Sequence, residues 1–192
     1  MTAPINVGTI VGLDSVYYAL LTSDAVGSIV YATPVPITRA ISANVNPNSS
    51  VDTLFADNGP SDTATTLGVV SLELGVAAIP FEVQAALLGH EVALGVMTRK
   101  STDIPPWVAI GFRSLKSNGK YRYSWLLKGK FSIPEDKNET KGDKIKFQTA
   151  SIKGNFVKRD ADNAWEISAD EDGTGYVATT ASTWFTIVPT VT

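Results

Sequence analysis

The chain has 192 residues, no cysteine, a single histidine and a formal net charge of −3. A chain of this length forms most simply one domain, residues 1–192, and buries enough surface to fold without a disulfide or a structural metal. The absence of cysteine excludes thiolate zinc sites, iron–sulfur clusters and cysteine nucleophiles. One histidine excludes the HExxH metalloprotease motif and any cage of several histidines.

The charges are unevenly distributed along the chain. Residues 1–98 hold eight acidic residues and one basic residue, residues 99–158 hold fourteen basic and five acidic residues, and residues 159–192 hold one basic and six acidic residues. One interpretation is a domain with differently charged faces. Another is a subunit whose acidic and basic surfaces meet across neighbouring copies.

Composition favours β structure. Valine, threonine, isoleucine and the aromatic residues together make up 69 of the 192 residues, and these side chains suit a pleated, half-buried surface. No stretch approaches 18 apolar residues, so we expect no transmembrane helix. The N-terminus lacks the basic flank and apolar run of a signal peptide.

The first half of the chain begins with an N-terminal arm at about residues 1–12. Apolar or alternating segments then predict strands at residues 16–21, 28–32 and 37–45. Residues 44–66 follow, rich in Asn, Asp, Ser and Thr and interrupted by Pro47, Gly59 and Pro60, with only a brief apolar segment at Val51–Phe55. We expect a long polar loop over this region.

An alternating strand at residues 70–76 precedes the one clear helix, at about residues 80–88. Pro80 stands at its start and Gly89 at its end. Asn118-Gly119 between two alternating segments predicts a β-hairpin. In the return strand, Tyr121, Trp125 and Phe131 fall on one face.

Further strands are expected over residues 144–152, at Phe156–Val157, at Tyr176–Val177 and at Trp184–Val188. The total is about ten strands with one short helix. This pattern predicts a mainly β fold, an antiparallel β-sandwich or barrel with one flanking helix.

Several candidate sites do not withstand scrutiny. His90 has no partner in a recognisable triad, so we interpret it as a turn or surface histidine. The GxGxxA match at residues 173–178 leaves no room for a dinucleotide-binding unit. The basic and aromatic residues of strand 120–131 fall on opposite faces, which favours a core strand over a nucleic-acid platform.

The acidic residues near the C-terminus do not have the spacing of a calcium-binding loop and are interpreted as solvated turns (Asp160, Asp162, Asp170, Glu171 and Asp172). We therefore expect no catalytic residue, no metal site and no cofactor.

Short sequence segments spread over residues 10–168 resemble the major tail proteins of long, non-contractile-tailed phages of Gram-positive bacteria. The segments that carry this resemblance are Tyr17–Thr22, Ala56–Asn58, Pro106–Phe112, Asn118–Phe131, Thr140–Asp143 and Phe147–Thr149. The resemblance implies a β-sandwich or barrel flanked by a helix, which forms hexameric rings that stack into a hollow tail tube. It also implies that double-stranded DNA passes through the lumen without specific recognition.

The resemblance further implies a structural virion protein and not an enzyme. Its partners would be further copies of itself, the tape-measure protein and the tail-end proteins. It would reside in the virion tail, and in the host cytoplasm during assembly, without membrane association.

On this basis we expect the loop at residues 44–66 to contact a neighbouring subunit or ring, through Asn46, Asn48, Asp52, Asp57, Asn58 and Asp62. A second hypothesis is that acidic side chains of the first half face the lumen, where they would keep DNA from binding.

Two other classes remain open from the sequence. One is the tube protein of a contractile tail or a secretion-type machine. The other is a monomeric β-sandwich module that binds a sugar or peptide through a concave aromatic patch, using Trp107 or Trp184.

Overall fold

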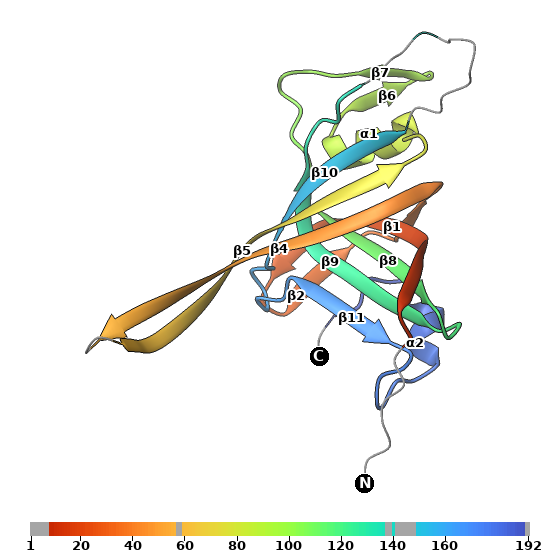
Figure 1. Ribbon diagram of the computed structural model, residues 1–192. Helices are drawn as coiled ribbons and strands as arrows, with labels where there is room; N and C mark the ends of the chain where they lie inside the picture. The colour runs from red at the N-terminus through yellow and green to blue at the C-terminus, as the bar shows by residue number, and fades with distance from the viewer. Residues whose placement is uncertain (1–7, 57–58, 137–139, 141–148, 191–192) are drawn as a thin grey trace.

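A computed structural model describes residues 8–56, 59–136, 140 and 149–190. This part of the chain forms eleven strands and two helices, so the predicted mainly β fold is confirmed. Nine strands form one antiparallel sheet in the order β2-β1-β8-β9-β10-β5-β4, with β3 paired to β1 and β11 paired to β9 (Figure 1). The strands are β1 (Ile10–Ala25), β2 (Ser28–Tyr31), β3 (Val35–Ile37), β4 (Ala40–Ala56), β5 (Gly59–Val76), β6 (Glu91–Ala93), β7 (Val96–Thr98), β8 (Val108–Lys116), β9 (Tyr121–Phe131), β10 (Ala150–Val157) and β11 (Glu166–Asp170).

Two local predictions from the sequence are confirmed. Helix α1 spans Phe81–Leu88, and Gly89 ends it in the left-handed conformation with φ 75°. Asn118-Gly119 joins β8 to β9, and Gly119 has φ 79°, the backbone geometry that favours glycine in such a turn.

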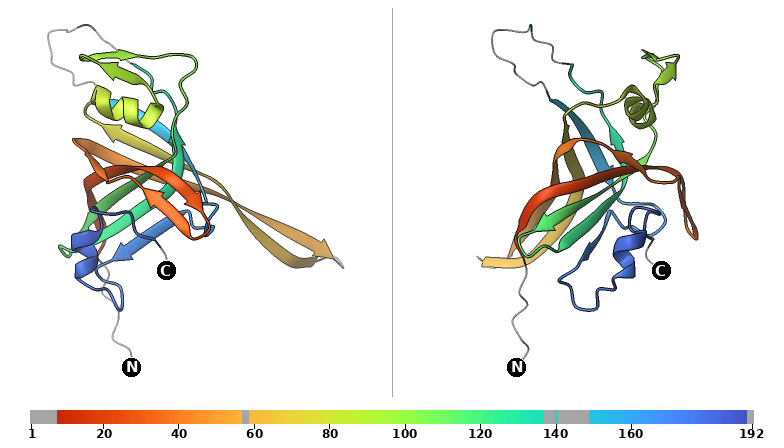
Figure 2. Two further views of the ribbon diagram at one scale, coloured as in Figure 1. Left: turned by 180° about the vertical axis from the view of Figure 1, so that it is seen from behind. Right: turned by 90° about the vertical axis from the view of Figure 1, so that its right-hand side faces the viewer.

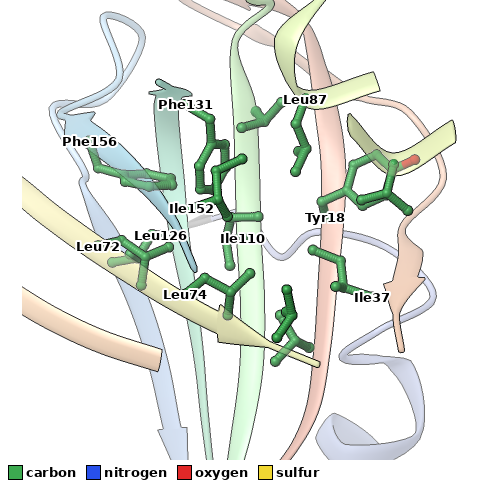
Figure 3. Close-up of a cluster of buried hydrophobic side chains, with 14 of the residues drawn as sticks. Tyr18, Ile37, Leu72, Leu74, Leu87, Ile110, Leu126, Phe131, Ile152 and Phe156 are labelled. Atoms are coloured by element: carbon green, nitrogen blue, oxygen red, sulfur yellow. The ribbon is translucent and has the colours of Figure 1, made fainter. Parts of the chain in front are cut away.

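The sheet curls around an inner core. Its buried side chains come from β1, β3, β5, β8, β9, β10 and α1, and include Tyr18, Leu72, Leu87, Ile110 and Phe156 (Figure 3). Because apolar surface removed from water is the main source of stability, this core holds the strands of the curled sheet together.

The opposite side of β1, β8 and β9 is buried as well, by the C-terminal segment, residues 171–190. Ala19, Ala109, Tyr123, Trp125, Leu127, Trp184 and Val188 form this outer cluster. Tyr17 stacks on Phe185 with ring centroids 4.3 Å apart, and Trp125 Nε1 donates to the Trp184 carbonyl at 3.0 Å. Strand β9 is therefore buried on both sides.

The late strands predicted at Tyr176–Val177 and Trp184–Val188 are wrong. The chain there forms turns and a second short helix, α2 (Thr179–Thr183). Tyr176, Trp184, Phe185 and Val188 pack their side chains into the outer cluster instead of pairing their backbone with a neighbouring strand, whereas Val177 and Ile187 are exposed.

The prediction that Phe131 shares a face with Trp125 is also wrong. The register between β8 and β9 shifts between the pairs Val108–Gly129 and Ile110–Leu126. This irregularity changes the alternation, so Trp125 lies in the outer cluster whereas Phe131 lies in the inner core.

The predicted loop at residues 44–66 is a long β-hairpin instead. Strands β4 and β5 pair from Ala40–Val76 out to Ala56–Gly59, and the far part projects away from the body (Figures 1 and 2). We call residues 48–56 and 59–69 the ribbon. Pro47 is tolerated because β4 is the last strand of the sheet and its register shifts just beyond this residue.

The predicted N-terminal arm lies mostly outside the described residues. Of its described part, Gly8 and Thr9 precede β1 and residues 10–12 belong to that strand. Thr9 is fixed to the β8–β9 turn, because Ser117 N donates to its carbonyl at 2.8 Å.

Close packing at Gly111 provides a test of the outer cluster. A Cβ atom at Gly111 would lie 2.4 Å from Cε2 of the buried Trp125. We expect Gly111→Ala to lower the free energy of unfolding by about 1–3 kcal/mol, because an overpacked core must shift. Urea denaturation measures this. Gly12→Ala is the control, since nothing lies within 4 Å of the added atom; equal stability of the two variants would contradict the described packing.

Candidate assembly surfaces

Three cations are buried around the doubly covered strands. The side chains of Lys116, Lys128 and Arg159 are 0%, 8% and 0% exposed. A buried charge is costly unless a carboxylate and further hydrogen bonds compensate it. Each of the three has such a partner.

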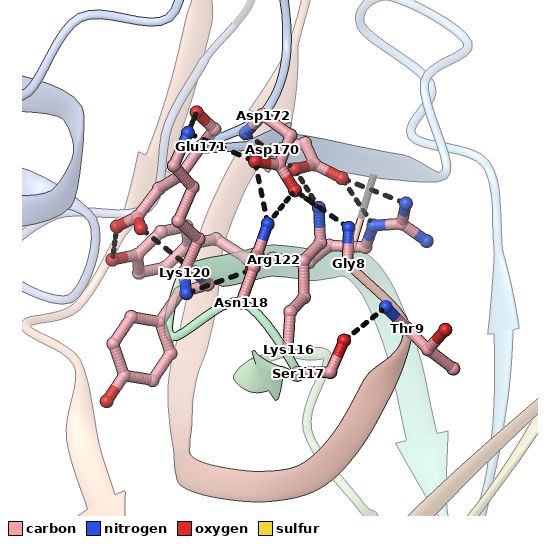
Figure 4. Close-up of polar contacts among 12 residues, drawn as sticks. Gly8, Thr9, Lys116, Ser117, Asn118, Lys120, Arg122, Asp170, Glu171 and Asp172 are labelled. Atoms are coloured by element: carbon pink, nitrogen blue, oxygen red, sulfur yellow. Dashed lines mark hydrogen bonds and ion pairs between the residues drawn. The ribbon is translucent and has the colours of Figure 1, made fainter. Parts of the chain in front are cut away.

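Lys116, at the end of β8, is held by the C-terminal segment and the strand that precedes it (Figure 4). Its Nζ contacts Asp170 directly and lies 2.9 Å from Oδ2 of Asp172. The same Asp172 carboxylate accepts from Nδ2 of Asn118 at 3.0 Å and from the backbone N–H of Gly8 at 3.3 Å. One ion cluster therefore joins the β8–β9 hairpin, the C-terminal segment and the start of the described chain.

These contacts favour the charged forms of all three groups. Hydrogen bonds from Lys116 and Asn118 hold the pKa of Asp172 well below its usual range. Burial acts to raise the pKa of Asp170, but its bonds to Lys116, the Asp172 backbone and Arg122 outweigh this, and the pKa is lowered. Burial acts to lower the pKa of Lys116, but its two carboxylate partners outweigh this and raise it.

Lys128 and Arg159 are neutralised in the same way. Lys128 Nζ lies 2.7 Å from Oδ2 of Asp24 and 2.6 Å from Oδ2 of Asp160. Arg159 Nε donates to Asp162 Oδ1 at 3.0 Å. The interpretation of the C-terminal acids as solvated turns is therefore wrong for Asp160, Asp162, Asp170 and Asp172, because these four compensate buried cations within the chain. Glu171 instead accepts a hydrogen bond from the Tyr123 hydroxyl at 2.9 Å.

The three cations are buried, so they do not contribute to a basic surface that meets the acidic surface of a neighbouring copy. Contact between the exposed charges of neighbouring copies stays a prediction. Lys116, Lys128 and Arg159 have carboxylate partners in their own chain. The acids of the ribbon are different. Within the described residues, neither Asp52 nor Asp62 has a cation within salt-bridge distance.

The sequence-predicted contact residues come together on the hairpin. Asn46, Asn48, Asp52 and Asp62 are all exposed. The first three alternate along β4, and Asp62 pairs opposite Leu54, so all four lie on one side of the hairpin. Asn48 Nδ2 donates to the Val69 carbonyl at 2.8 Å, which ties the strands together at the base of the ribbon.

Two of the predicted contact residues, Asp57 and Asn58, lie outside the described residues. What sequence reasoning missed is the apolar content of the ribbon. Its exposed large side chains are Val51, Leu54, Phe55, Leu67 and Val69. The signal was the alternation of Val45, Pro47, Ser49 and Val51, which Pro47 itself and the intervening Asn46 and Asn48 obscured.

The other candidate groups have structural roles. His90 lies in the turn after α1, as expected, but it is buried and not on the surface, and its Nδ1 lies 2.7 Å from Oδ2 of Asp103. Nothing within the described ranges groups three potential metal-ligating side chains. No helix in the same ranges is long and apolar enough to span a membrane.

The tryptophans do not form an exposed aromatic patch. Trp184 is buried in the outer cluster. Trp107 is 38% exposed, but Lys128 Nζ and Lys130 Nζ lie 5.0 and 4.6 Å from its ring centroid. A pocket of about 520 Å³ between β5, β10 and residues 132–135 has no aromatic residue among its described lining, which includes Glu73, Ser151 and Lys153.

A scan against protein-family models and a search of curated proteins find no match to this chain. The ribbon and the internally compensated body are therefore the features from which a function must be argued.

The Lys116 cluster predicts how stability depends on pH. We expect Lys116→Met to lower the free energy of unfolding at pH 7 by about 2–3 kcal/mol, because it removes a buried cation from two carboxylates. In the wild type, the ionised Asp170 and Asp172 stabilise the fold above their ordinary pKa of about 3.9, and this contribution is lost as the pH falls through their lower folded-state values.

The difference in the free energy of unfolding between the wild type and Lys116→Met should therefore become smaller below about pH 4. Urea denaturation at pH 7, 5, 4 and 3 measures this. Lys100→Met is the control, because Lys100 forms an exposed pair with Glu91 and its loss should change stability little. A difference that stays constant with pH would contradict the proposed role of the cluster.

Proposed function

We propose that this chain is the structural subunit of a phage tail tube, of the long, non-contractile type. Its copies form rings, hexameric in the family that the sequence resembles, and the rings stack into a hollow tube that conducts double-stranded DNA. The tape-measure protein and the tail-end proteins are its partners, and the virion tail is its location.

The observation that carries this proposal is the free-standing ribbon. It projects from the body and exposes five large apolar side chains (Val51, Leu54, Phe55, Leu67 and Val69). An isolated two-stranded hairpin is at best marginally stable in water, and large apolar side chains gathered on an exposed surface indicate a contact site. The ribbon therefore gains stability when another molecule covers it.

The chemistry of the described body leaves the ribbon as the feature on which the proposal rests. Its buried cations are compensated internally, and its other side chains with unusual chemistry, His90 and the C-terminal acids, serve packing and ion pairing. The sequence segments that resemble the tail-tube family include the one that forms β9, the strand buried on both sides, and one that begins at the far end of β4.

The acidic side of the ribbon fits a surface that avoids nucleic acid. Residues 40–76 contain four acidic residues and no lysine or arginine. Side chains such as Asp52 and Asp62, where they face the lumen, repel the phosphate backbone and let DNA pass. A solved tube with a basic lumen would contradict this part of the proposal.

Electron microscopy tests the function directly. We expect the purified full chain to form rings or hollow tubes at high concentration, with a parallel rise in light scattering. A protein that stays monomeric at every concentration tested would contradict the proposal.

A shortened variant tests the ribbon. Pro47 and Val70 are cross-strand partners, so residues 48–69 can be replaced by Asn-Gly to close a two-residue hairpin turn. We expect a folded monomer with a cooperative unfolding transition and no tubes, because the body keeps its core. Tubes of normal length from this variant would contradict the assignment of the ribbon as the contact element.

A further inference from the structure

The ribbon has two chemically different sides. Side chains alternate along each strand, and directly paired residues share a side. One side carries the pairs Ser50–Thr66, Asp52–Ala64 and Leu54–Asp62, and the other carries Ser49–Leu67, Val51–Thr65 and Thr53–Thr63. We call the first the acidic side and the second the uncharged side.

The uncharged side continues the core-facing side of the sheet. Along β4 it follows Ala43, Val45 and Pro47, whose partners on β5 are buried in the inner core. Beyond Pro47 the same side is open to solvent, and Val51 is 63% exposed. The side of β4 that faces the core near Val45 therefore continues beyond Pro47, where its side chains are exposed to solvent.

A second uncovered apolar element lies at another end of the molecule. The β6–β7 hairpin carries no charge over residues 92–97, and Leu94 at its turn is 104% exposed. It protrudes from the body beside α1, well away from the ribbon (Figures 1 and 2).

The backbone at this turn makes the leucine unusual. Leu94 has φ 51° and Gly95 has φ 79°, so both turn residues are in the left-handed region. Asn, Asp or Gly is the ordinary residue at the first of these positions, and a leucine there adds backbone strain and exposes apolar surface. An apolar side chain held at a strained, fully exposed turn points to a contact role.

We propose that the β6–β7 hairpin of one copy, led by Leu94, docks on the uncharged side of the ribbon of a second copy. The proposal rests on the self-assembly described above and assigns its contacting residues. Neither surface carries a charge, so burial of one on the other removes apolar area from water without stranding an ion.

A second copy is the fitting occupant because both surfaces belong to the same chain and project from different parts of it. A head-to-tail contact covers the hairpin of one copy and the ribbon of the next, and leaves one of each free to continue the assembly. The acidic side of the ribbon stays in water.

Substitutions at matched positions test the sidedness. Val51 and Leu54 are 63% and 64% exposed and lie on opposite sides of the ribbon. We expect Val51→Asn to raise the concentration needed for assembly at least about tenfold, as fits the loss of one buried aliphatic side chain. Leu54→Asn should leave it within about threefold. An equal rise in the assembly concentration for the two variants would overturn the proposal that the uncharged side of the ribbon makes the contact.

Leu94→Asn tests the partner surface. Asparagine accepts the left-handed backbone better than leucine, so the variant keeps the turn while it removes the apolar side chain. We expect unchanged or higher thermal stability of the monomer together with at least about a tenfold rise in the assembly concentration. Normal assembly of Leu94→Asn would overturn the proposal even where the wild type forms tubes.

Cross-linking separates this inference from the proposed function. The chain has no cysteine, so mixing a Leu94→Cys protein with a differently tagged Val51→Cys protein permits a mixed disulfide only between copies. We expect that mixed dimer to form under mild oxidation in clear excess over the one from Leu94→Cys and Leu54→Cys. Mixed dimers in a sample without tubes would support the contact and count against the tail tube. Tubes without the mixed dimer would overturn the contact and leave the tail tube in place.

Discussion

The fold depends on the compensation of cations beside strands that are covered on both sides. Strand β9 lies between the inner core and the outer cluster, and Lys116, Lys128 and Arg159 are drawn out of water around it. Desolvated cations need carboxylates close by, and the chain supplies them from β1 and from the segments that follow β10. The C-terminal segment is thus fixed twice, by aromatic packing and by ion pairs. Its short helix and turns need no backbone pairing with the sheet.

This internal neutralisation accounts for three of the basic side chains, which are buried and paired within the chain and so do not contribute to a charged face. The basic middle of the sequence and its acidic end meet inside one molecule. The acids of the first half are divided: Asp24 joins the Lys128 cluster, while Asp52 and Asp62 remain on the ribbon without a cation among the described residues. The ribbon is therefore the part of the described body where unpaired acids and exposed aliphatic side chains occur together.

The sequence predicts the elements that are set locally. Gly89 and Gly119 end a helix and close a hairpin through left-handed backbone conformations that favour glycine, and both predictions are confirmed. The continuation of β4 beyond Val45 escaped prediction because Asn46, Pro47 and Asn48 are poor strand residues individually, and only the pairing of β4 with β5 makes this segment a strand. The predicted contact residues were named for their polarity, whereas the exposed Val51 and Leu67 on the other side of the ribbon become visible once the register is known.

The same register limits how the ribbon can associate. Two exposed strand edges invite indiscriminate pairing, and natural sheets counter this with prolines, charges and irregular register. The hairpin of β4 and β5 has all three: it contains Pro47 and Pro60, Asp52 and Asp62 place charge on one side of it, and its register shifts at three places. These features disfavour edge-to-edge stacking and association through the acidic side. In the proposed assembly, the uncharged side is the one that can be buried without desolvating Asp52 or Asp62, so the alternation of the strands would confine the proposed contact to one surface.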